Sequence, residues 1–311
     1  MSDTPDKPVK LRLGTRRSPL AMAQAEEARD RLCAAHGWEQ SAVELVPVMA
    51  SGDRIQDRPL AEIGGKALWT RELDLWLHED RIDAAVHSMK DVETLRPDWL
   101  AIAAILPRAD KRDVLVGAVS IETIPQGAKV GTSAPRRAAQ MLSARPDVDI
   151  VMFRGNVATR LAKLEAGEAD VTLLAKAGLD RLGDDDVGTP LELNDWMPAP
   201  GQGAIGIECR ADDAQVRDWL AAIDHAPSRA EVEAERALLA ALGGTCHSPV
   251  GMDTRWHDDR LAINCCLLSP DGSESIQFLQ RVEGPHWARS MASALLEHCD
   301  PKTRAVFDGP H

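Results

Sequence analysis

Asp83-Ala84-Ala85-Val86-His87-Ser88-Met89-Lys90-Asp91 is the stretch that decides the fold. It begins on an acidic turn, crosses a short apolar segment of strand length and ends on a polar cluster. In an open α/β sheet, ligands bind in the crevice beyond the carboxyl ends of the strands. The pattern therefore predicts a buried strand that presents Lys90 and Asp91 to a ligand. A solvated surface ion pair is the alternative for these two residues.

The same plan occurs a second time. Residues 170–176 repeat the acidic turn, the apolar strand and the lysine, and segments 14–24 and 131–140 share the order Gly-Thr, proline, glutamine. The first copy lies in a β-α-β-α-β series, which is typical of a sheet with helices on its faces. We expect two α/β lobes of similar design that face one cleft. A long polar loop is expected from Ala50 to Gly65.

Composition narrows the class of protein. The 311 residues are 44% hydrophobic and 27% charged, as in an ordinary globular protein, and are long enough for two or three domains. A net charge of −13 argues against nucleic acid or an anionic membrane as the main partner. The polar segment Met1–Lys10 does not resemble a secretory signal, and no apolar run reaches transmembrane length. We expect a cytoplasmic protein.

Arginines cluster at three expected helix starts: Arg16 and Arg17, Arg136 and Arg137, and Arg154 with Arg160. Residues 131–160 hold five arginines against Asp147 and Asp149, so this window carries +3 within a chain of −13. Helix N-termini favour anions, and the planar guanidinium binds carboxylates in a bidentate manner. The set indicates a polyanionic small-molecule ligand, although any single arginine could be a solvated first-turn residue.

Cys246 differs from the other five cysteines in its surroundings. No C-x-x-C pair or metal-ligand spacing is present, and Cys33 and Cys265-Cys266 lie in segments expected to be core. Cys246 lies in a glycine- and proline-flanked loop beside His247, where a thiol could be exposed and reactive. An unreactive loop cysteine is the alternative. A cysteine hydrolase lacks a recognisable signature here. The G-x-G-x-x-G match at 201–206 follows prolines and precedes a strand, which is the wrong context for a dinucleotide site.

These stretches together resemble the porphobilinogen deaminase (hydroxymethylbilane synthase) family, in the family's order from Leu11 onward. The motifs that carry the resemblance are Thr15-Arg16-Arg17-Ser18-Pro19, Gly64-Gly65-Lys66, His87-Ser88-Met89-Lys90-Asp91, Gly131-Thr132-Ser133, Arg136-Arg137, Arg154-Gly155-Asn156-Val157, Gly201-Gln202-Gly203-Ala204 and the Cys246 loop. The resemblance implies an α/β fold with two periplasmic-binding-protein-like lobes and a small α+β C-terminal domain. Domain 1 would comprise residues 1–106 and 200–222, domain 2 residues 107–199 and domain 3 residues 223–311.

The resemblance also implies a chemistry. Four porphobilinogen molecules would condense with loss of ammonia into hydroxymethylbilane, on a dipyrromethane cofactor joined to Cys246 by a thioether. Asp91 would be the catalytic carboxylate. Cofactor and substrate binding would involve Arg16, Ser18, Lys90, Asp91, Thr132, Ser133, Arg136, Arg137, Arg154, Gly155, Asn156, Arg160, Arg181 and Gln202. The polypyrrole intermediates would stay bound to a monomeric enzyme that needs no metal.

Five positions depart from the family's pattern: Glu62, Trp69, Ala134, Pro135 and Thr245. None removes Asp91, Cys246 or the arginines, so they bear on substrate affinity more than on activity. A cleft protein that binds anions without catalysis is the competing hypothesis. It leaves the third domain and Cys246 unexplained.

Overall fold

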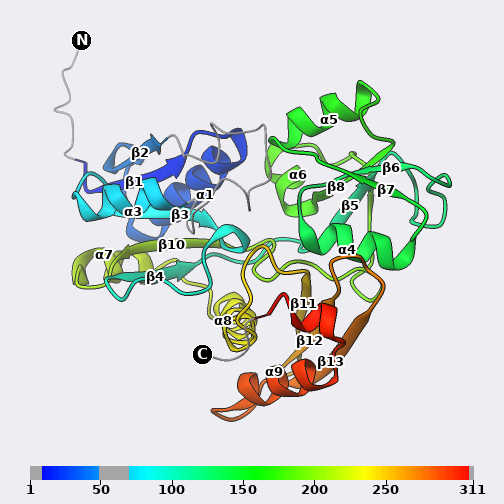
Figure 1. Ribbon diagram of the computed structural model, residues 1–311. Helices are drawn as coiled ribbons and strands as arrows, with labels where there is room; N and C mark the ends of the chain where they lie inside the picture. Colours follow the sequence, from blue (N-terminus) through cyan, green and yellow to red (C-terminus); the bar gives the residue numbers. More distant parts are fainter. Residues whose placement is uncertain (1–8, 49–69, 308–311) are drawn as a thin grey trace.

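The computed structural model describes residues 9–48 and 70–307. Two lobes lie side by side, and a third, smaller domain lies below both (Figure 1). The polar loop expected from Ala50 to Gly65, together with Glu62, Lys66 and Trp69, lies outside the described residues. Within the described ranges, no helix is long and apolar enough to cross a membrane.

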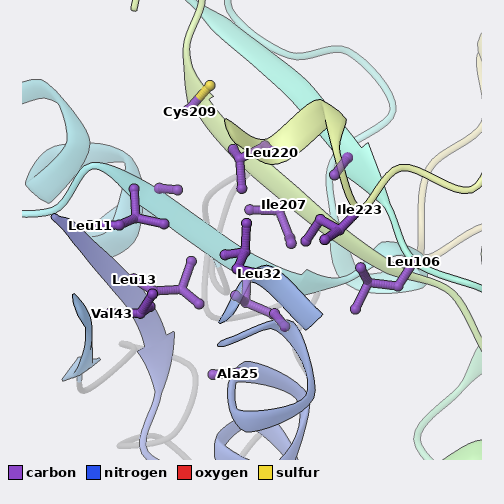
Figure 2. Packing of buried hydrophobic residues seen from close by; sticks show 14 of the residues in the cluster. Leu11, Leu13, Ala25, Leu32, Val43, Leu106, Ile207, Cys209, Leu220 and Ile223 are labelled. Carbon is purple, nitrogen blue, oxygen red and sulfur yellow. The ribbon is translucent and has the colours of Figure 1, made fainter. Parts of the chain in front are cut away.

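The first lobe is built on a five-stranded sheet in the order β2-β1-β3-β10-β4. β1 is parallel to β2 and β3, whereas β10 is antiparallel to β3 and β4. Its elements are β1 (Leu11–Arg16), α1 (Pro19–His36), β2 (Val43–Val48), α3 (Arg71–His78), β3 (Ala84–Ser88), β4 (Leu100–Ile105), β10 (Ile205–Arg210) and α7 (Ala214–Ala221). Fully buried Leu11, Leu13 and Leu32 pack with Ile207 and Leu220 between the sheet and its helices (Figure 2).

The second lobe repeats this topology, with a sheet in the order β7-β6-β8-β5-β9. β6 is parallel to β7 and β8, and the antiparallel β5 takes the place of β10. Its elements are β5 (Asp113–Val116), β6 (Lys129–Gly131), α4 (Pro135–Ala144), β7 (Asp149–Val151), α5 (Val157–Glu165), β8 (Val171–Ala175), α6 (Lys176–Leu182) and β9 (Thr189–Pro190). The predicted pair of similar α/β lobes is therefore confirmed.

The third domain is a three-stranded antiparallel sheet, β11-β12-β13, packed against α8 and α9. Its elements are α8 (Ala226–Ala241), β11 (Val250–His257), β12 (Arg260–Leu268), β13 (Ser275–Arg281), α9 (Trp287–His298) and α10 (Pro301–Arg304). The position of β10 within the first sheet supports assigning residues 200–222 to domain 1. The three domain boundaries remain a prediction.

The three domains meet at Arg108. Its guanidinium donates to both carboxylate oxygens of Glu235 on α8, at 2.8 and 2.9 Å, and to the Gln202 carbonyl at 2.9 Å. Glu235 also accepts from the Gly201 amide at 2.6 Å and from Thr254 Oγ1 at 2.7 Å. The Glu235 carboxylate has no exposed surface. It thus links domain 3 to the two segments of chain, at Arg108 and Gly201, that run between the lobes. Charge-assisted bonds in such a site are strong, and breaking one side leaves a buried charge.

Candidate active site

Asp91 lies just beyond the carboxyl end of β3, as the sequence predicts. The strand ends at Ser88, and residues Met89–Asp91 form a single 3₁₀ turn, η3, anchored by Met89, whose amide donates to the Ala204 carbonyl at 3.0 Å. Gly206 leaves room for Met89, since a Cβ there would lie 2.0 Å from its Sδ. A Cβ on Gly201 would likewise lie 3.0 Å from the Lys90 backbone nitrogen, so Gly201 and Gly206 leave room for the turn that carries Asp91.

Cys246 lies in the turn between α8 and β11. Ser248 Oγ accepts from the Thr245 amide at 3.0 Å, and the His247 amide donates to Thr245 Oγ1 at 3.1 Å. Thr245, one of the departures from the family pattern, thus stabilises the turn. Cys246 is exposed as a residue, but the protein around its thiol and the carboxylates of Asp91 and Glu93 raise its pKa to about 11. Burial lowers the pKa of His247, so the site holds a neutral thiol beside a carboxylate, not a thiolate–imidazolium pair.

Asp113 forms the buried centre of the second lobe's half of the site. Arg136 and Arg137 lie 2.8 and 2.7 Å from its two carboxylate oxygens, and Trp196 Nε1 and Gln202 Nε2 each donate to it at 2.8 Å. Although burial opposes it, the two guanidinium groups hold the pKa of Asp113 far below its usual range. Two arginines sharing one carboxylate leave a net positive charge in the protein interior.

This cluster has unused donors. The Nε atoms of Arg136 and Arg137 are buried and have no hydrogen-bond partner among the described residues. Buried donors are nearly always paired, so these two atoms call for an acceptor that the described residues do not supply. A ligand rich in carboxylates has the acceptors that would satisfy them.

The pKa values of two further cations, Lys90 and Arg160, are lowered near this cluster. Burial and the nearby Arg137 and Arg136 lower the pKa of Lys90 to about 8, against the opposing effect of Asp91. Burial together with Arg137 and Arg154 lowers the pKa of Arg160 to about 10, again opposed by Asp91. Asp91 therefore lies close enough to act on the pKa of groups from all three domains: Lys90, Arg160 and Cys246.

Arg160 forms no ion pair with any residue in ranges 9–48 and 70–307, and its Nε donates only to the Gly155 carbonyl at 3.1 Å. Arg154 is buried beside it. A buried cation such as Arg160, close to other cations and with no ion pair among the described residues, is costly unless an anion binds beside it.

The remaining predicted site residues have local roles in the structure. Ser18 and Asn156 are the N-caps of α1 and α5, accepting from the amides of Ala21 at 3.3 Å and Thr159 at 2.9 Å. The Gln202 side chain binds Asp113, Lys111 and Arg136, and Thr132 Oγ1 accepts from the Ala134 amide. Gly155 has a φ of 119°, which an L side chain would strain.

Three other predicted residues lie at the lobe edges. Arg16 ends β1, and Ser133 lies just before α4; both are partly buried. Arg181 pairs across the lobes with Glu27 at 3.3 Å. The structure thus brings Lys90, Asp91, Cys246 and the cations of the second lobe together. Ser18, Gly155, Asn156 and Gln202 form supporting contacts.

The sequence analysis missed Asp113 and Glu93 as members of the site. Asp113 begins an apolar strand and is the first residue of β5, and a carboxylate at such a position must find buried partners. An acidic residue at the start of an apolar strand is therefore the sequence signal by which Asp113 could have been found. Glu93 gives no signal in sequence, because its proximity to Cys246 arises from domain packing.

The site and topology define a class: a two-lobed α/β protein with a cluster of buried cations in its second lobe and a third domain that carries an exposed cysteine. The chain belongs to the porphobilinogen deaminase family. The family model for the dipyrromethane cofactor binding domain of porphobilinogen deaminase matches residues 11–218, and that for its C-terminal domain matches residues 229–297.

Curated relatives span the whole chain. Porphobilinogen deaminase of Sphingopyxis alaskensis is 54% identical, with 98% of each chain covered, and that of Paracoccus denitrificans is 50% identical, with 99% of each covered. Membership makes the chain an enzyme, a transferase of tetrapyrrole biosynthesis with a dipyrromethane cofactor domain.

Solved structures similar to 72% of the chain include the Bordetella pertussis BvgS VFT2 domain (91% of it covered, 14% identity, TM-score 0.40). Another is a periplasmic His/Glu/Gln/Arg/opine family-binding protein from Silicibacter pomeroyi (94% of it covered, 16% identity, TM-score 0.36). The sheet orders, more than these scores, define the fold class.

Proposed function

We propose that this protein condenses four porphobilinogen molecules, with release of ammonia, into hydroxymethylbilane on a dipyrromethane primer joined to Cys246 by a thioether. The observation that carries the proposal is that the Asp91 carboxylate acts on the pKa of the Cys246 thiol and of the cations Lys90 and Arg160, so these groups lie near one another. This supports a site in which Cys246 is the point of attachment, Asp91 is the catalytic carboxylate and the nearby cations bind the ligand's acidic groups.

Each group has a physical task. When bound, the dipyrromethane supplies the pyrrole carbon to which new units are added. Asp91 holds negative charge where positive charge develops on a porphobilinogen ring as ammonia leaves, which lowers the barrier because the charge is preorganised in a partly buried site. Lys90, Arg154 and Arg160 bind the acetate and propionate groups of the pyrroles, and the free Nε donors of Arg136 and Arg137 complete the set.

Tethering explains the need for a cysteine. A covalently held acceptor turns each addition into a reaction within one complex, which raises its effective concentration and prevents release of intermediates. None of the six cysteines forms a disulfide, which supports our further proposal that the protein works in the reducing cytoplasm, and we also propose that it is a monomer.

Intact mass spectrometry tests the proposal. The purified protein should carry an added mass equal to two pyrrole units, and peptide mapping should place it on Cys246. Cys246→Ala should fold, lack the added mass and lack turnover, while Cys299→Ala, at a half-buried thiol in domain 3, should keep both. An unmodified wild-type protein that binds porphobilinogen without releasing ammonia would instead indicate a binding protein.

A further inference from the structure

The segment that follows Asp91 contacts the Cys246 loop directly. Thr94 Oγ1 donates to the Gly244 carbonyl at 3.0 Å, joining residues 150 positions apart in the sequence. Thr94 lies three residues after Asp91, and Gly244 lies two residues before Cys246. This hydrogen bond is therefore a short connection between the two groups that the reaction needs.

Arg236 on α8 binds the same segment from the other side. Its Nη2 donates to the carbonyls of Glu93 at 2.8 Å and Thr94 at 3.0 Å, and its Nη1 lies 3.5 Å from that of Val92. Arg236 forms no ion pair within the described part of the chain. The carboxylate of Glu93 binds Arg96 at 2.7 Å.

The guanidinium of Arg236 is partly buried, and its hydrogen bonds to described residues all go to uncharged backbone carbonyls. Burial lowers the pKa of Arg236, so the cation is poorly solvated and depends on these carbonyl oxygens. If the segment moved away, the donors would lose their partners at a desolvation cost. Arg236 thus fixes the path of residues 92–94 relative to α8, the helix that leads into the Cys246 loop.

The loop is equally constrained at its first residues. The Gly244 amide donates to the Leu239 carbonyl at 2.9 Å, and a Cβ on Gly244 would lie 2.6 Å from Leu239 Cδ1. Ser248 then closes the turn by accepting from the Thr245 amide. The Gly244 carbonyl, which accepts from Thr94, is therefore held in place. Cys246 lies two residues later, so its position depends on that of Gly244.

We propose that Thr94 and Arg236 are positioning residues that hold the Cys246 loop against the Asp91 segment, so that the thiol and the carboxylate occupy one site. The proposal rests on the proposed function for the roles of Asp91 and Cys246. The hydroxyl of Thr94 is the specific element, because removing it leaves the size of the side chain unchanged.

The test compares Thr94→Val, which removes the donor, with Thr94→Ser, which keeps it. Thr123→Val is the matched control, since Thr123 Oγ1 also donates to a backbone carbonyl, that of Ser120 at 2.9 Å, but in the second lobe. Full-length apoprotein from cells that make no porphobilinogen is alkylated with iodoacetamide between pH 7 and 10, and Cys246→Ala gives the background from the other thiols. With the loop released from Asp91, alkylation of Cys246 at pH 8 should rise about tenfold in Thr94→Val, because more of the thiol ionises.

A second measurement follows attachment. Porphobilinogen is added to the apoprotein, and the gain of mass on Cys246 is timed. Loss of one hydrogen bond predicts an attachment rate about three- to tenfold slower in Thr94→Val, restored in Thr94→Ser and unchanged in Thr123→Val. Arg236→Lys should show a partial defect, because the charge is kept but the forked donation is lost.

If both Thr94→Val and Arg236→Lys show the same alkylation profile and the same attachment rate as the wild-type protein, the positioning role is overturned. If the wild-type protein itself gains no pyrrole mass, the proposed function fails. The alkylation profile then still decides the positioning role, since it needs only the chain's own thiol.

Discussion

Arg137 Nη2 lies 2.7 Å from Asp113 Oδ1, in a site where the Asp113 side chain has no exposed surface. The same carboxylate also pairs with Arg136, at 2.8 Å, so the two arginines share one counter-charge. The arginines that the sequence assigns to ligand binding therefore belong first to a buried ion cluster. The cations of the site are therefore of two kinds. Arg136 and Arg137 have a buried counter-charge within the protein, whereas Arg160 has none in the described part of the chain.

Asp113→Asn should destabilise the apoprotein strongly. Removing one partner of a buried ion pair typically costs about 3–5 kcal/mol, because the remaining charge is left uncompensated. Because the folded-state pKa of Asp113 is depressed, its stabilising contribution is present above the unfolded pKa of about 3.9 and is lost only as the pH falls below that value. Urea unfolding at pH 7 measures the loss. Asp110→Asn, which removes one of the ion-pair partners of the partly exposed Arg112, should change the free energy of unfolding by at most about 1 kcal/mol.

Arg160→Leu and Arg137→Leu should have different effects on the stability of the protein. Arg160→Leu removes a cation that burial and its neighbours disfavour, so the free energy of unfolding should stay the same or rise while KM for porphobilinogen increases about ten- to a hundredfold. Arg137→Leu should lower stability as well, because Asp113 loses a partner. Unfolding curves and steady-state kinetics of both variants separate the two effects. Equal KM values for Arg160→Leu and the wild type would remove Arg160 from the ligand site.

Lys90 should titrate near neutrality in the apoprotein. Its pKa of about 8 means that the ammonium is lost as the pH rises through 8, whereas an unfolded lysine keeps its proton to about 10.4. Between these values the unfolded chain binds more protons, so this group makes stability rise with pH there. ¹³C NMR of labelled lysine, with Lys90→Arg to assign the signal, should show a midpoint about two pH units below those of the other lysines. A bound carboxylate ligand should raise that midpoint, and a midpoint near 10 without ligand would contradict the burial argument.

Asp91→Asn should keep the fold and the Cys246-linked cofactor yet lose at least ~100-fold in kcat. Asparagine preserves the shape of the side chain but offers neither full negative charge nor a proton-accepting carboxylate, and one such group is worth that much. Asp91→Glu should retain more activity, since it keeps the charge at a displaced position. Intact mass establishes the cofactor, and single-turnover release of ammonia gives the rate. Near-wild-type release by Asp91→Asn would require a different catalytic carboxylate.

Much of the fold could be predicted because it is locally encoded. The alternation in β1, the N-cap Ser18 with Pro19 before α1, and the repeated Asp-strand-Lys plan identify the strands and helices of both lobes. Other elements escaped prediction for physical reasons. β11 carries Gly251, Asp253 and Thr254 on positions that domain packing buries, so its composition resembles a loop. β7 is shorter than the apolar run from Val148 to Phe153 suggests, since Phe153 turns to fill the space that Gly131 leaves open.

The sequence alone determined the two-lobed plan, the family and the chemical types at the site, because periodicity, capping and motif residues act over a few neighbouring positions. Only the tertiary structure decided which of these groups act together. Asp113 pairs with Arg136 and Arg137, Glu93 helps to raise the pKa of Cys246, and Thr94 binds Gly244 across 150 residues of chain. Such pairings depend on how three domains pack at Arg108 and Glu235. Burial there sets the strength of each charge interaction, and no local pattern in the chain records which residues will be buried side by side.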